Sequence, residues 1–383
     1  MPGANALPMA PPPQSPLARY RILSPTASVR VSPLCLGAMS LGDAWSDSLG
    51  PCSPETTEEI LDYFYSQGGN FIDTANNYQF EESERRIGAW MKKRGNRDQM
   101  VIATKYTTSF LAVEPDMPAK ANILINYGGN GSKSLHLSVK ASLEKLQTDY
   151  IDILYVHWYD FSTSIPELMH ALNTLILSRR VLYLGASDTP AWIVSKANEY
   201  ARAHNLVPFS IYQGRWSASA RDFEREIIPM CRAEGMALAP WGALGSGNFR
   251  SAEQRARGKE EGRKGESSER DVKVSEVLER VAERKGSTVT GIAQAYVCAK
   301  AGYVFPIVGC RTLEHLKGNI EALKVKLSRE DIREIEGAVP FQLGFPGDML
   351  WGKEVPEVMG DVWLLGMGGT TDYVPDGKPL GRE

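Results

Sequence analysis

Residues 56–74, TTEEILDYFYSQGGNFIDT, contain a helix-like segment followed at once by a strand-like one. Ile60 and Phe64 stand four residues apart, the spacing of one helix face, and the neighbouring Gly68 and Gly69 are typical of a helix end. Two apolar residues then begin a run that turns polar at an aspartate. The segment therefore predicts a helix that leads into a short buried strand with a carboxylate at its end.

Eight short apolar runs occur along the chain, most of them separated by amphipathic, helix-like segments. They span residues 32–37, 70–74, 101–105, 151–157, 182–187, 209–213, 236–241 and 303–309. Strands that alternate with helices form a parallel sheet with the helices outside it, and eight strands close a (β/α)8 barrel.

A doubly wound open sheet is the alternative architecture. In sheets of that kind that bind dinucleotides, G-x-G-x-x-G follows the first strand, whereas this chain has LCLGAMSLG there. The span from residue 31 to about residue 337 also fits the size of a barrel. We therefore predict an α/β fold of the (β/α)8 TIM-barrel type in a single domain.

Other segments do not follow the barrel pattern. We expect a flexible, proline-rich arm over 1–18, the barrel over 19–337 and a C-terminal extension over 338–383. Within the barrel, RYRILSP and VRVSP near its start predict a hairpin across the barrel floor. The charged, glycine-bearing stretch 246–270 predicts an insertion over one face.

Composition narrows the class of protein. The chain has 383 residues, of which 43% are hydrophobic and 23% charged, and a net charge of −3, which is typical of a globular protein and not of a nucleic-acid-binding one. Its apolar runs are shorter than the roughly 18 residues of a membrane span, and its start resembles no secretory signal. Five cysteines without a C-x-x-C motif favour a reducing cytoplasm, in which the sequon at Asn130 would not be glycosylated.

Polar residues end five successive predicted strands: Asp73, Lys105, His157, the pair Ser187 and Asp188, and Gln213. In a barrel these positions share one rim, where catalytic residues lie. Each has an ordinary structural interpretation, such as a helix cap or a solvated lysine. Together, and with Tyr78 on the loop after Asp73, they form an improbable structural coincidence.

Four of these residues suit one chemistry. A tyrosine has a pKa of about 10, and a nearby lysine ammonium lowers it by stabilising the phenolate. An aspartate keeps such a lysine charged, and a histidine can orient a carbonyl oxygen. The set can give a proton to an oxygen while a hydride attacks the carbon, since no serine or cysteine beside a base suggests a protein nucleophile.

The segments FIDTANNY (71–78), VIATKY (101–106) and DILYVHWYD (152–160) resemble the aldo-keto reductases, and the resemblance extends over nearly all of 20–340. Longer stretches at 126–160, 184–192 and 308–323 are closer still to fungal aryl-alcohol dehydrogenases. That branch includes reductases similar to norsolorinic acid reductase of polyketide mycotoxin pathways. The resemblance implies a barrel that binds a nicotinamide cofactor without a Rossmann domain. It also implies a catalytic tetrad, which consists of Asp73, Tyr78, Lys105 and His157.

The resemblance further implies the residues that bind NADP(H). Around the nicotinamide they are Ser187, Asp188, Gln213 and Trp241; along the phosphates, Leu244 and Ser246; at the adenosine, Gly309, Cys310, Arg311 and Asn319. Two positions depart from the family. Many members have asparagine where this chain has Asp188, and an ionised carboxylate cannot donate to a carboxamide oxygen. Many also have lysine or serine near Gly309, so the grip on a 2′-phosphate depends mainly on Arg311.

These expectations predict that the chain is a reductase of aryl aldehydes or ketones. Its predicted partners are small aromatic carbonyls or alcohols, and not nucleic acid or membranes. Trp45, Trp158, Tyr159 and Trp216 follow strands at the same rim and suit an aromatic pocket; the alternative for half of them is a core position under the loops. The alternative is a nicotinamide-binding redox sensor or partner-binding barrel with little turnover.

Two weaker motifs predict no site. GGNGSKS at 128–134 lacks the spacing of a phosphate-binding G-x-x-x-x-G-K-[ST] loop. His157 and Asp160 could hold a metal, but the other histidines do not have metal-ligand spacing, so we expect no metal.

Overall fold

The computed structural model describes residues 9–111, 120–257, 267–350 and 362–370. Within them, eight parallel strands pair in the order β10-β3-β4-β5-β6-β7-β8-β9. Their bounds are β3 Cys35–Gly37, β4 Phe71–Asp73, β5 Val101–Tyr106, β6 Ile151–Val156, β7 Val181–Ser187, β8 Ile211–Arg215, β9 Ala237–Trp241 and β10 Ile307–Gly309. A parallel bridge between Leu238 of β9 and Val304, which precedes β10 in the chain, brings the two ends of this order together and nearly closes the barrel.

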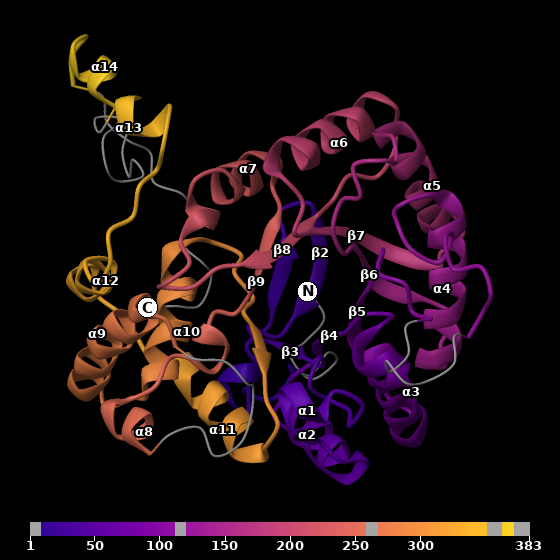
Figure 1. Ribbon diagram of the computed structural model, residues 1–383, viewed down its shortest axis with the longest axis horizontal. Helices are drawn as coiled ribbons and strands as arrows, with labels where there is room; N and C mark the ends of the chain where they lie inside the picture. The colour runs from indigo at the N-terminus through magenta and orange to yellow at the C-terminus, as the bar shows by residue number, and fades with distance from the viewer. Residues whose placement is uncertain (1–8, 112–119, 258–266, 351–361, 371–383) are drawn as a thin grey trace.

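Helices alternate with these strands and cover the outside of the barrel (Figure 1). The α-helices are α1 Ser46–Leu49, α2 Pro54–Ser66, α3 Glu82–Arg94, α4 Ser132–Leu146, α5 Ile165–Leu177, α6 Ala191–Ala203, α7 Ile227–Glu234, α8 Ala252–Ala256, α9 Glu269–Lys285, α10 Val289–Lys300, α11 Leu313–Glu321, α12 Arg329–Glu336, α13 Gly347–Leu350 and α14 Trp363–Gly366. The described residues also form six 3-10 helices: Pro16–Ala18, Tyr78–Glu81, Arg97–Gln99, Asp222–Glu224, Gly245–Gly247 and Ala322–Lys324. The (β/α)8 prediction is therefore confirmed.

Helix α2 shows how the local sequence defines an element. The Ser53 side chain accepts from the Thr56 N–H at 3.2 Å, and a proline occupies the first turn. The buried face carries Ile60 and Phe64, as the spacing predicts, and Leu61 is buried beside them. The helix ends before Gly68, whose φ of +86° disfavours other residues.

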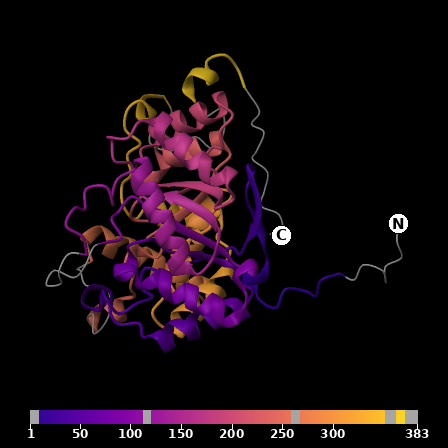
Figure 2. The ribbon, with the colours of Figure 1, turned by 90° about the vertical axis from the view of Figure 1, so that its right-hand side faces the viewer.

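A hairpin covers the amino-terminal end of the barrel. Strands β1 Arg21–Ser24 and β2 Ala27–Val31 pair antiparallel, as predicted. Leu23 and Val31 are fully buried in one cluster with side chains of the barrel interior, among them Phe305. The hairpin therefore lies at one end of the barrel (Figure 2), so the site predicted at the carboxyl ends of the strands is at the opposite end.

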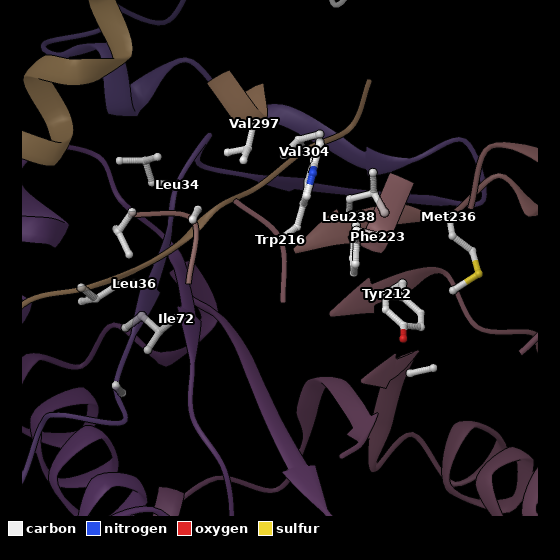
Figure 3. Close-up of a cluster of buried hydrophobic side chains, with 14 of the residues drawn as sticks. Leu34, Leu36, Ile72, Tyr212, Trp216, Phe223, Met236, Leu238, Val297 and Val304 are labelled. Atoms are coloured by element: carbon white, nitrogen blue, oxygen red, sulfur yellow. The ribbon is translucent and has the colours of Figure 1, made fainter. Parts of the chain in front are cut away.

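The larger core lies between barrel and helices. Alternate strand residues such as Leu36, Ile72 and Leu238 point outward into a cluster that also contains Trp216 and Phe223 (Figure 3). Each such side chain contributes roughly 1.5–3 kcal/mol when fully buried. This core keeps the strand ends in fixed positions.

The segments outside the barrel are described in part. The predicted insertion at 246–270 contains α8, and its residues 258–266 lie outside the described ranges. In the extension, Phe341 lies against the guanidinium groups of Arg221 and Arg225, with centroid distances of 4.5 and 5.0 Å. Helices α13 and α14 lie at one edge of the molecule (Figure 1). At the other terminus, Leu17 is fully buried, and the Ser15 hydroxyl donates to the Gln67 carbonyl.

Candidate active site

Alternation along the strands brings polar side chains into the barrel mouth. Phe71, Val101, Ala103 and Ile211 face the barrel interior. Side chains two residues apart share a face, so Asp73 and Lys105 also face inward at the carboxyl ends of β4 and β5, as does Gln213 in the middle of β8. The last inward positions of these strands are therefore polar, whereas those below them are apolar.

A buried ion pair forms the centre of this cluster. The Lys105 ammonium donates to the Asp73 carboxylate, Nζ to Oδ1, at 2.5 Å, and to the Thr74 carbonyl at 2.6 Å. Lys105 is 0% exposed and Asp73 3%. Gln213 donates to the second Asp73 oxygen at 2.8 Å. Desolvation lowers the pKa of Lys105, but the Asp73 carboxylate and Tyr78 together outweigh it and raise this pKa, so the lysine is charged.

Tyr78 lies above this pair. The Lys105 Nζ is 4.8 Å from the centroid of its ring, and the ring is edge-on to that of His157 at 5.9 Å. The structure therefore brings together the four residues of the predicted tetrad.

The Tyr78 phenol differs from the expectation in one respect. Lys105 does act to lower its pKa, as expected, but desolvation has the larger effect and raises the pKa above the ordinary value of 10. The phenol is therefore protonated at neutral pH, which is the state required of a proton donor.

His157 continues the polar rim directly after β6. Its backbone N–H donates to the Tyr106 carbonyl at 3.0 Å. Within the described residues its Nδ1 is buried without a hydrogen-bonding partner. Desolvation, together with the nearby Lys105 charge, lowers the pKa of His157 to about 3, so the imidazole is neutral at physiological pH.

This neutral imidazole makes the fold sensitive to acid. Between about pH 6.5 and 3 the unfolded chain binds a proton at His157 that the folded chain does not, so stability falls as the pH falls. We expect the free energy of unfolding to drop by up to about 1.4 kcal/mol for each pH unit below pH 6. His157→Gln should remove this part of the slope, measured by urea unfolding at several pH values. The exposed His136→Gln is the control and should retain it; a slope unchanged in the His157 variant would contradict a neutral buried imidazole.

Residues predicted around the nicotinamide form a second linked group. The Trp241 indole N–H donates to both Asp188 oxygens at 3.2 Å, and the Ser187 hydroxyl donates to Asp188 at 3.2 Å. The Asp188 N–H donates to the Gln213 carbonyl at 2.9 Å. Asp188 is thus occupied by internal donors and fixes the half-buried indole. Gln213 links this group to Asp73.

The loop after β9 carries Leu244 and Ser246 in an unusual backbone. Gly242, Gly245 and Gly247 have φ values of +71°, +76° and +87°, and Ser246 has +53°. Among the described residues, no atom would meet a Cβ placed on Gly247, so none of them covers the backbone there. A loop of this kind lets a ligand approach backbone N–H groups.

The end of β10 carries the predicted adenosine residues. Arg311 precedes α11, whose N-cap is Thr312, and its guanidinium lies where a side chain at Gly50 would be. Within the described parts of the chain, this guanidinium has no carboxylate partner. Burial raises the pKa of the Cys310 thiol to about 12, and the Cys310 carbonyl accepts from the Ser40 hydroxyl at 3.1 Å. Asn319, on α11, is 7% exposed.

The four candidate pocket aromatics differ in their surroundings. Trp216 is fully buried, stacks on Phe223 at 5.6 Å and belongs to the core of Figure 3, so it cannot line a pocket. Trp45 is edge-on to Tyr78 at 6.1 Å. Trp158 is 41% exposed, and Tyr159 is half-buried.

Sequence reasoning missed the residue that holds Trp45. The Gln79 side-chain oxygen accepts from the backbone N–H of Trp45 at 2.6 Å, and its side-chain nitrogen donates to the Met39 carbonyl at 2.8 Å. Its φ of +53° begins three successive left-handed residues that continue through Phe80 and Glu81. Such conformations cost of order 1–3 kcal/mol each, and the only sequence signal was the loop position itself.

Among the described residues, no three His, Cys, Asp or Glu side chains are grouped so that they could hold a metal ion. No helix described in the structure has the length and hydropathy needed to cross a membrane.

Comparison with known proteins extends these observations. Residues 33–340 match the aldo/keto reductase family. The chain is 57% identical over 371 residues to norsolorinic acid reductase B of Dothistroma septosporum, covering 94% of this chain and 93% of that protein. It is 52% identical over 382 residues to norsolorinic acid reductase A of Aspergillus parasiticus, covering 98% and 96%. A putative aryl-alcohol dehydrogenase of Saccharomyces cerevisiae is 52% identical over 348 residues, covering 89% and 92%.

Proposed function

Because the chain belongs to the aldo/keto reductase family and is an oxidoreductase of carbonyl groups, we propose that it interconverts aryl aldehydes or ketones and their alcohols with NADP(H). The observation that carries the proposal is the protonated Tyr78 phenol beside a buried, charged Lys105. The relative named for aryl alcohols supports an aryl substrate. The relatives named for norsolorinic acid support a role in fungal polyketide-type metabolism.

Each tetrad residue has a role in this proposal. Tyr78 donates its proton to the carbonyl oxygen, and Lys105 stabilises the phenolate that remains. Asp73 holds the ammonium in place and keeps it charged. Neutral His157 orients the carbonyl oxygen by a hydrogen bond. When bound, reduced nicotinamide supplies a hydride for the carbonyl carbon.

The chain offers a set of residues that fits such a cofactor. The family uses nicotinamide dinucleotides. Trp241 presents a fixed indole face, and the backbone near Gly247, which no described residue covers, suits phosphate oxygens. We propose that Ser187, Asp188 and Gln213 hold the carboxamide, that Leu244 and Ser246 lie along the phosphates, and that Gly309, Cys310, Arg311 and Asn319 hold the adenosine. Because none of the five cysteines forms a disulfide, we also propose a reducing, cytoplasmic location.

A direct assay tests the function. Purified protein should oxidise NADPH in the presence of benzaldehyde-type substrates, followed at the NADPH absorbance. Tight NADPH binding without turnover of any aryl carbonyl would instead favour the redox-sensor alternative.

Arg311 should decide the choice between NADPH and NADH, which differ only in the 2′-phosphate. A guanidinium at a helix start that pairs with none of the described carboxylates can give a phosphate two charge-assisted hydrogen bonds. We expect Arg311→Ala to weaken NADPH binding by about 2–4 kcal/mol and to leave NADH binding nearly unchanged. Fluorescence quenching titrations with both cofactors measure this.

Arg329→Ala is the matched control, since Arg329 is an exposed arginine at the start of another helix, α12. It should change neither affinity. An Arg311 variant that loses both cofactors equally, or neither, would remove the 2′-phosphate role and the preference for NADP over NAD.

A further inference from the structure

The segment GGNGSKS has a function that its resemblance to a phosphate loop did not suggest. Asn130 is fully buried, so the sequon there is inaccessible in the folded chain. Its backbone N–H donates to the Asp160 carboxylate at 2.7 Å, and its carbonyl accepts from the Tyr106 hydroxyl at 3.2 Å. Both backbone groups of this buried residue are therefore satisfied.

The Asn130 side chain is satisfied as fully. Its amide nitrogen donates to the Thr107 hydroxyl at 2.9 Å and to the Trp158 carbonyl at 3.0 Å. Its amide oxygen accepts from the Asp160 N–H at 2.7 Å. One side chain therefore joins the loop after β5 to both ends of the tripeptide Trp158-Tyr159-Asp160 after β6.

Asp160 is the residue that Asn130 bonds in both directions, since each accepts a hydrogen bond from the backbone N–H of the other. Burial would raise the pKa of Asp160, but three backbone N–H donors outweigh it and hold that pKa at about 2. The carboxylate therefore stays ionised throughout the physiological pH range and can accept these hydrogen bonds at any such pH.

The tripeptide that Asn130 holds, residues 158–160, begins directly after His157 of the predicted tetrad. Trp158 directly follows His157, and its indole N–H donates to the Thr108 hydroxyl at 3.2 Å, while 41% of the residue remains exposed. The residue is thus held by its carbonyl and by its indole N–H, with part of its surface open at the rim. A rigid exposed indole suits a flat aromatic ring, because stacked aromatic pairs gain energy beyond their buried area.

We propose that Asn130 is a positioning residue that fixes Trp158 at the rim and thereby makes the site selective for aryl over alkyl carbonyls. The proposal rests on the proposed reductase function. Asn130 acts through Trp158 and touches no reacting atom, so its loss should affect the binding of aryl substrates more than the chemical step.

The kinetic test compares benzaldehyde with propanal in wild type, Asn130→Ala, Trp158→Ala and the double variant. We expect Asn130→Ala to lower the ratio of kcat/KM for benzaldehyde to that for propanal at least tenfold, through the KM of benzaldehyde. Trp158→Ala should lower it similarly, and the double variant no further, since both changes remove one interaction. An unchanged ratio in Asn130→Ala, or full additivity in the double variant, would overturn the proposal.

Asn96→Ala is the control for loss of a buried amide, because Asn96 is 2% exposed and, within the described residues, neither of its amide atoms has a partner. It should leave the ratio unchanged. If Asn130→Ala does not fold, Thr107→Val removes one acceptor of the Asn130 side chain. That variant should lower the ratio about threefold, and no change would count against the proposal.

A second measurement does not depend on turnover. Hydrogen exchange of the amides of 157–163 should accelerate at least tenfold in Asn130→Ala and not in Asn96→Ala, while exchange in β4 stays the same. If wild type reduces neither aldehyde, the proposed function fails, and exchange alone decides the role of Asn130. Unchanged exchange in 157–163 would overturn that role whatever the substrate.

Discussion

Replacing Tyr78 by phenylalanine should lower kcat for carbonyl reduction by about 10²–10⁴-fold, the range for loss of a general acid. The phenol is the protonated group beside the charged Lys105, and phenylalanine keeps the ring that packs against Trp45 and His157. Affinity for NADPH should change little, because the residues proposed to hold the cofactor lie on other strands and loops. Steady-state kinetics and fluorescence titration together separate the two effects.

Tyr155→Phe is the matched control for this experiment. The Tyr155 ring also lies near Lys105, with a centroid distance of 5.9 Å, but it is fully buried in the barrel interior and out of reach of substrate. That variant should keep most of its turnover. A Tyr78→Phe enzyme with more than half of wild-type kcat would take the phenol out of the mechanism.

The fold could be predicted because hydrophobic periodicity is a local property. All eight predicted strands are present, but several are shorter than the apolar runs that predicted them. At Ser32 the backbone N–H bonds to the Asn70 side chain at 2.7 Å, so the run at 32–37 pairs only from Cys35 onward. Which residues of an apolar run join the ladder depends on neighbours distant in sequence, and periodicity carries no such information.

The candidate site was predictable in its residue types and less so in its energetics. Strand-end polarity indicated Asp73 and Lys105, and the structure pairs them. The pKa of Tyr78 depends on two opposing effects, desolvation and the lysine charge, whose balance requires coordinates.

Trp216 follows a strand as Trp158 does, yet Trp216 is in the core and Trp158 is exposed, because burial depends on which segments pack over the residue. Gln79 has a left-handed backbone conformation, which residues other than glycine rarely adopt, so no propensity argument predicts it.

Replacing Lys105 by methionine should have two large consequences. The Tyr78 phenolate loses its stabilising charge, so kcat should fall by about 10²–10⁴-fold. The Asp73 carboxylate, 3% exposed, would be left without its counter-ion, so the protein should lose about 3–5 kcal/mol of stability. Steady-state kinetics and urea unfolding at pH 7.5 measure the two losses separately.

The pair is tested by adding Asp73→Asn. The double variant carries no buried charge at this position, so it should be more stable than Lys105→Met alone while its kcat falls little further. Lys93→Met is the control: the Lys93–Glu58 pair is also short, at 2.6 Å, but its lysine side chain is 58% exposed, so its loss should cost at most about 1 kcal/mol. If the Asp73 and Lys105 losses instead add fully in both stability and kcat, the aspartate has a role independent of the lysine, and the ion pair is not the unit that sets the charge beneath Tyr78.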